Sequence, residues 1–72
     1  MKTLPQTAFA LREASLDNIK KYCERENAEF TEVRKYLTEK ADTNNTLIPI
    51  DFYLRMYNLS VQLLNNEPFT EY

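Results

Sequence analysis

The chain has 72 residues, of which 43% are hydrophobic and 28% are charged, and its formal net charge is -2. This composition is typical of one folded domain, residues 1–72, and is too apolar for an intrinsically disordered chain. The balance of 9 basic against 11 acidic residues argues against nucleic-acid binding, which favours a dense basic patch. The single cysteine excludes an intrachain disulfide.

The sequence contains no glycine. Two-residue β-hairpin turns depend on residues that tolerate positive φ, so such turns are not expected here. Asparagine is the next most tolerant residue type, so we expect helices to end near Asn27, at Asn44–Asn45 and at Asn65–Asn66. The sequence therefore predicts an all-α fold, a small three-helix antiparallel bundle with a short extended C-terminal tail. The expected helices are about 6–26, 28–41 and 49–65, and the tail is 66–72.

The first helical segment carries apolar residues at helical spacing on one face. They are Phe9, Leu16, Ile19 and Cys23. Ser15 is a residue type that caps the start of a helix, so a break near Ser15 is the alternative to one continuous helix. We favour the continuous helix.

The second segment has one apolar stripe, with charged residues on the other side. The stripe consists of Phe30, Val33, Tyr36, Leu37 and Ala41. Apolar residues spaced by seven run from Phe9 to Leu37, which permits one long helix through Asn27. A turn at Asn27 is favoured, because a single helix of that length would have no core of its own.

The third segment follows the polar connection 42–48. Pro49 suits the first helical position, and Asp51 places its charge in the first turn, where it interacts favourably with the helix dipole. This helix is apolar on two nearly opposite faces. One face consists of Ile50, Leu54, Tyr57, Val61 and Leu64, and the other of Phe52, Met56, Leu59 and Leu63.

A helix that is apolar nearly all round is either central in its own fold or paired with a partner. We assign the first of these faces to the core and the second to a partner. The predicted core is Leu16, Ile19, Cys23, Phe30, Val33, Leu37, Leu54, Tyr57, Val61 and Leu64. The predicted protein-binding residues are Phe52, Met56, Leu59, Leu63, and Phe69 and Tyr72 in the tail.

The partner is expected to be a second copy of the chain or another protein. In a symmetric homodimer, Met56 and Leu59 would meet their own equivalents. For the tail, the alternative is that it folds onto its own bundle. If the residues of the third helix belong to the core instead, we expect the binding surface around Tyr22, Arg25 and Tyr36.

Enzyme chemistry is not expected. The chain has no histidine to shuttle protons at neutral pH, and Cys23 lies on an apolar face, as a buried structural thiol does. Segment 42–46 is similar to the start of a calcium-binding loop, but Leu47 replaces the required glycine and Tyr53 the bidentate glutamate. We therefore expect no catalytic residues, cofactor, metal or small-molecule substrate.

The functional hypothesis is a cytoplasmic protein-binding module, an adaptor or an inhibitor of a larger protein machine. Its size and charge are similar to those of bacterial or phage accessory inhibitors. Charged and amide residues interrupt segment 47–64, so it is not expected to span a membrane. The alternative is a helix-turn-helix DNA-binding regulator, in which Arg34, Lys35 and Lys40 would contact DNA against the repulsion of neighbouring glutamates.

Overall fold

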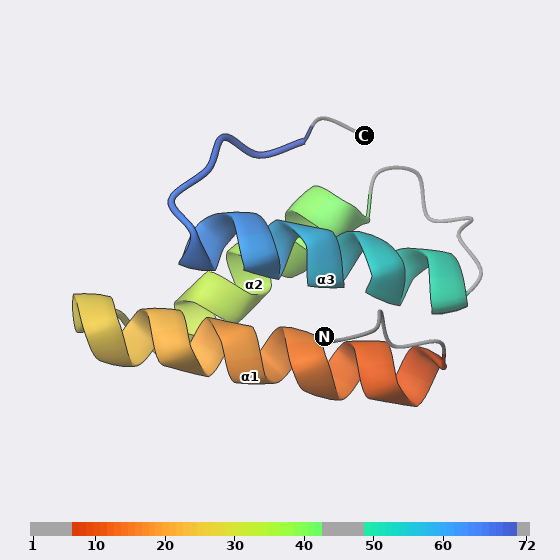
Figure 1. Ribbon diagram of the computed structural model, residues 1–72, viewed down its shortest axis with the longest axis horizontal. Helices are drawn as coiled ribbons and strands as arrows, with labels where there is room; N and C mark the ends of the chain where they lie inside the picture. Colours follow the sequence, from red (N-terminus) through yellow and green to blue (C-terminus); the bar gives the residue numbers. More distant parts are fainter. Residues whose placement is uncertain (1–6, 43–48, 71–72) are drawn as a thin grey trace.

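The computed structural model describes residues 7–42 and 49–70, which form three helices. The helices are α1 (Ala8–Glu26), α2 (Phe30–Ala41) and α3 (Pro49–Leu64). Helices α1 and α3 lie side by side and run in the same direction, while α2 returns obliquely behind α3 (Figure 1). Consecutive helices thus run in opposite senses, and the predicted all-α three-helix bundle is confirmed.

The helix ends follow the residue types that the sequence supplies. Thr7 begins α1, and its hydroxyl oxygen accepts a hydrogen bond from the Ala10 amide at 3.0 Å. Asn27 ends α1 with φ of 54°, and Asn66 follows α3 with φ of 57°. The expectation that asparagine takes positive-φ positions is confirmed at both sites. The predicted break at 44–45 lies outside the described residues.

Helix α1 continues through Ser15 without a break, so the alternative of two helices was wrong. The Ser15 hydroxyl donates to the Leu11 carbonyl at 2.7 Å, which allows this polar side chain to be buried within the helix. Ser60 on α3 is also buried, and its hydroxyl donates to the Tyr57 carbonyl at 2.7 Å. The Asn18 side chain of α1 donates to Ser60 at 3.2 Å, so α1 and α3 also make a polar contact.

The core joins all three helices, and its membership differs in part from the prediction. Burial of the predicted core residues Ile19, Cys23 and Leu37 is confirmed. Phe30 and Val33 are partly buried and pack against this core. The predicted core residues that are only half-buried are Leu16, Leu54, Tyr57, Val61 and Leu64. The buried apolar residues that the prediction left out are Leu11, Ala41, Met56 and Leu59.

Part of the α3 face that was assigned to a partner therefore lies in the core. Met56 is 5% exposed and Leu59 is fully buried, while Phe52 and Leu63 pack against the same core. The burial of both side chains does not favour the expected homodimer contact through Met56 and Leu59, and that contact stays a prediction. The physical reason for the burial is that Ser60 lies beside this face and is small enough to be buried where α1 approaches.

The described part of the tail folds onto its own bundle. Gln62 on α3 donates to the Thr70 hydroxyl at 2.6 Å and accepts from the Thr70 amide at 3.0 Å. The Phe69 ring lies 6.1 Å from that of Tyr36 on α2, and the Lys40 ammonium lies 5.5 Å from the Phe69 ring centre. The segment thus connects α3 to α2 through polar and aromatic contacts.

Candidate functional site

The most exposed apolar side chain lies on α1 and not on α3. Among the described residues, the large hydrophobic side chains that are exposed are Phe9, at 71%, and Tyr36, at 52%. Tyr36 contacts the Phe69 ring of the tail, so part of its surface serves the fold. Phe9 leaves most of its ring in water, where an aromatic side chain gains nothing from burial.

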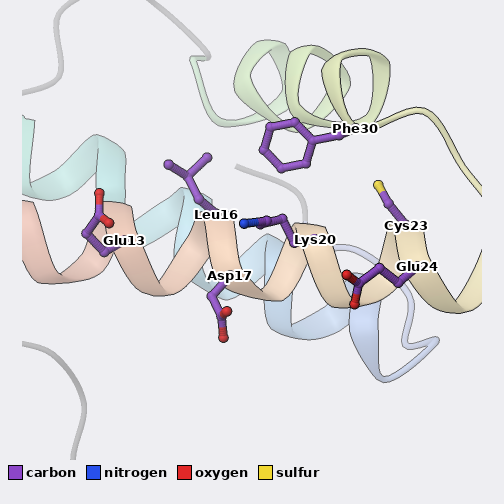
Figure 2. A pocket seen from close by; sticks show the side chains of 7 residues that line it. All are labelled: Glu13, Leu16, Asp17, Lys20, Cys23, Glu24 and Phe30. Carbon is purple, nitrogen blue, oxygen red and sulfur yellow. The ribbon is translucent and has the colours of Figure 1, made fainter.

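An open groove of about 530 Å³ lies between α1 and α2. Its apolar lining is Leu16 and Cys23 from α1 and Phe30 from the first turn of α2. Figure 2 shows the Leu16 and Phe30 side chains projecting into the space between the two helices. The charged residues that line the groove all come from α1: Glu13, Asp17, Lys20 and Glu24.

Helical geometry explains why Phe9 and the groove share one face of α1. At about 100° per residue, Phe9, Leu16 and Lys20 lie within a narrow arc. Leu11, on the core face of α1, lies more than a third of a turn away from that arc, and Ile19 lies between them. Phe9 therefore points from the same side of α1 as the groove, one heptad before Leu16.

The charges around the groove are exposed. Glu13 pairs with Arg12 at 3.0 Å, and Asp17 pairs with Lys21 at 3.2 Å, with all four side chains about half exposed. Exposed ion pairs of this kind contribute little to stability, so a partner can exchange them at small cost. Within the described residues, the Lys20 ammonium forms none of the observed salt bridges.

A smaller hollow of about 230 Å³ adjoins the groove, and Leu16 lines both. The guanidinium-bearing residues Arg12 and Arg34 lie at this hollow, together with Phe52 and Met56 from α3. Two of the predicted protein-binding residues thus border a recess between the helices. The groove and the hollow share Leu16, with three carboxylates and Lys20 at the groove and two arginines at the hollow.

The remaining predicted contact residues are not brought together at this surface. Leu59 is buried, Leu63 packs against the core, and Phe69 lies against Tyr36. Tyr72 lies outside the described residues. Sequence reasoning missed the groove, although its signal was present in the run of apolar residues spaced by seven from Phe9 to Phe30.

The alternative surface around Arg25 serves the fold. The Arg25 guanidinium donates to the Leu64 carbonyl at 2.7 Å and to the Asn66 side-chain oxygen at 3.3 Å. It also lies 5.5 Å from the centre of the Tyr22 ring. Arg25 therefore stabilises the end of α3, where carbonyl groups have no partner within the helix.

The environment of Cys23 in the groove disfavours a reactive thiol. Burial raises the pKa of the Cys23 thiol above its ordinary value, and the nearby Glu29 carboxylate raises it further. The reactive thiolate is therefore disfavoured at neutral pH. In the parts of the chain that the structure describes, no group of three or more His, Cys, Asp or Glu side chains is placed to hold a metal ion.

The residues proposed for DNA contact do not form one basic surface. Arg34 lines the small hollow, whereas Lys40 lies 6.0 Å from the Tyr36 ring centre and 5.5 Å from that of Phe69. The acidic residues Glu29, Glu32 and Glu39 are exposed on or beside α2. The helix-turn-helix reading stays an untested hypothesis, and nothing in this geometry favours it.

Comparison of the chain with protein-family models, curated proteins and solved structures found no match. Over residues 7–42 and 49–70, none of the helices combines the length and apolar character that crossing a membrane would need. The function is therefore inferred from the physical chemistry of the surface.

Proposed function

We propose that this chain is a small non-catalytic protein-binding module of the cytoplasm, an adaptor or an inhibitor of a larger protein. Its binding surface is the groove between α1 and α2 together with Phe9. The observation that supports this proposal is a ring that is 71% exposed on the same face as an open apolar groove. This surface replaces the α3 face, because Met56 and Leu59 are occupied in the core.

The composition of this surface fits a protein partner better than a nucleic acid. Leu16 and Phe30 supply an apolar centre, and charged side chains surround it, as in the centre and rim of protein interfaces. The carboxylates of Glu13, Asp17 and Glu24 line the groove against one ammonium group, from Lys20. That excess of negative charge would repel phosphate groups.

The test is site-specific photo-crosslinking in the cells that produce the protein. We expect the full chain with Phe9→p-benzoylphenylalanine to form a discrete adduct with a protein, because position 9 lies at the proposed interface. The matched control is Lys35→p-benzoylphenylalanine, which places the same group on an exposed position of α2 that lines neither the groove nor the hollow. Absence of an adduct from position 9, or equal adducts from both positions, would overturn the proposal.

A further inference from the structure

We infer that the occupant of this groove is a basic amphipathic helix of the partner protein, an inference that rests on the proposed function. The apolar side of that helix packs on Phe9, Leu16 and Phe30. Its lysine or arginine side chains lie along one flank and meet the carboxylates of α1. The direction of the apolar row, the backbone of the groove walls and the charge of the lining each support this occupant.

The apolar row of the groove runs along α1. Phe9, Leu16 and Cys23 are spaced by seven residues, so they follow one another on one side of the helix over about 21 Å. Leu16 and Cys23 line the groove, and the Phe9 ring is exposed one heptad before Leu16. A row with this spacing packs against the apolar row of a second helix that lies alongside it. The row is long enough for about four turns of that helix.

The walls of the groove favour a helix over an extended peptide. An extended segment gains affinity by adding main-chain hydrogen bonds to the open edge of a sheet. Both walls of this groove are helices, α1 and α2, whose backbone groups are paired within each helix except at its ends. A partner segment must therefore satisfy its own backbone, as a helix does, and it presents only side chains to the groove.

The charge of the lining selects a basic flank. Glu13, Asp17 and Glu24 follow one another at spacings of four and seven residues, which places their carboxylates in a row along α1. This row is about 17 Å long and lies beside the apolar row. Among the described residues that line the groove, α2 contributes only Phe30, so no charge on that wall offsets the carboxylates. Lysine or arginine residues that flank the apolar stripe of a partner helix would pair with this row.

Two of the three carboxylates are held only by exposed ion pairs. Asp17 pairs with Lys21 at 3.2 Å, and Glu13 pairs with Arg12 at 3.0 Å. Pairs of this kind contribute little to the stability of the fold. Neither Lys21 nor Arg12 lines the groove. A basic side chain that approaches from the groove can therefore replace either pair at small cost.

Glu24 is the carboxylate that gains most from a basic partner. Within the described residues it forms none of the observed salt bridges. Lys20 is the one basic residue in the lining, and Figure 2 shows its ammonium group directed toward Leu16 and away from Glu24. The Glu24 carboxylate is therefore the position at which a charge change should alter binding most.

The test is the affinity of two synthetic helical peptides for the full chain, measured by fluorescence anisotropy at low and high salt. Both peptides carry leucine at the heptad positions that form an apolar row over about four turns. The flanking positions are lysine in one peptide and glutamate in the other. We expect the lysine peptide to bind at least about ten-fold more tightly at low ionic strength. Salt should reduce this preference, because it screens the flanking charges.

Two charge variants of the chain assign the binding to the groove. Glu24→Lys replaces an attraction by a repulsion, so it should weaken binding of the lysine peptide about ten-fold. Glu39→Lys is the matched control, because it changes the net charge equally at an exposed position of α2 that lines neither the groove nor the hollow. Both substituted side chains are exposed, so far-UV circular dichroism should show that both variants are folded.

Three results would overturn the basic helix as the occupant. The first is equal affinity of the lysine and glutamate peptides for the natural chain. The second is an equal effect of Glu24→Lys and Glu39→Lys on the affinity of the lysine peptide. The third is no binding of the lysine peptide up to about millimolar concentration.

The photo-crosslinking experiment separates this inference from the proposed function. Mass spectrometry of the adduct from position 9 identifies the partner segment, in which we expect an apolar stripe at helical spacing and an excess of lysine and arginine. An adduct with an acidic segment of another protein overturns the basic helix and keeps the binding module. An adduct with a second copy of the chain also overturns the basic helix. Absence of an adduct from position 9 overturns the binding module, and the inference falls with it.

Discussion

Leu54 and Leu59 lie on the same helix with the same side chain, but only Leu59 is fully buried, while Leu54 is half-buried. Alanine at each position measures which face of α3 holds the fold together. Leu59 belongs to the cluster that contains Ile19 and Leu37, so Leu59→Ala leaves a cavity between three helices. At Leu54, water can reach the side chain already, and it can fill the space that a truncation leaves.

The expected magnitudes differ several-fold. A fully buried Leu→Ala change costs about 3–5 kcal/mol, from lost apolar transfer together with the cavity. For Leu54→Ala we expect about 1 kcal/mol, since only part of the side chain is removed from water in the native state. The core of a chain this small supplies only about 3–5 kcal/mol in total. Leu59→Ala should therefore leave the chain largely unfolded at 25 °C, while Leu54→Ala stays folded.

The assay is urea unfolding followed by far-UV circular dichroism. Both variants are measured at the same protein concentration, which is low enough to keep any dimer dissociated. Leu59→Ala should show little or no folded baseline, and Leu54→Ala a transition shifted modestly to lower urea. If Leu54→Ala proved as destabilising as Leu59→Ala, or more so, the burial of the Met56–Leu59 face described here would be refuted. The original assignment of the two faces would then be restored.

Two further predictions concern Asn27 and Cys23. Asn27→Ala should lower the free energy of unfolding by about 1 kcal/mol, because alanine is strained at positive φ, whereas Asn27→Gly should be nearly neutral. Thermal unfolding should show a melting temperature about 4–8 °C lower for the alanine variant. Equal melting temperatures of the two variants would contradict this. The pKa of Cys23 is raised by burial, so its neutral thiol contributes stability that is fully present below the unfolded pKa and is lost as pH rises through the folded pKa. Urea midpoints of the natural chain and Cys23→Ala, measured from about pH 7 to about pH 10, should therefore converge as pH rises, and a constant difference would exclude this linkage.

Local structure was largely predictable, because it depends on residues that are close in sequence. The expected helices at about 6–26, 28–41 and 49–65 are observed as Ala8–Glu26, Phe30–Ala41 and Pro49–Leu64. Without glycine, the chain can place positive φ only where asparagine stands, so Asn27 and Asn66 mark helix ends. Pro49 likewise begins α3 because its fixed φ fits the first turn. Proline lacks a backbone N–H group, and at this position that group would have no acceptor within the helix.

The candidate site was less predictable, because it depends on how the faces of different helices meet. A helical wheel gives the angles between side chains on one helix, and it does not say which of two apolar faces turns inward. The predicted core contains neither Ser15 nor Ser60, although both are buried with hydroxyl groups that are satisfied by the carbonyls of their own helices. The rotation of α1 that buries Leu11 is also what leaves Phe9 in solvent.

Residue order by itself determined three helices, their ends and the all-α class, since capping, positive φ and apolar spacing act over a few residues. Only the tertiary structure decided that Met56 and Leu59 face inward and that Leu16 lines a groove with Phe30. The physical reason is that core membership is set by close packing between helices, where side-chain volume decides which faces can approach. Helix α1 lies against α3 where Asn18 meets the small side chain of Ser60, and that approach leaves the opposite side of α1 open.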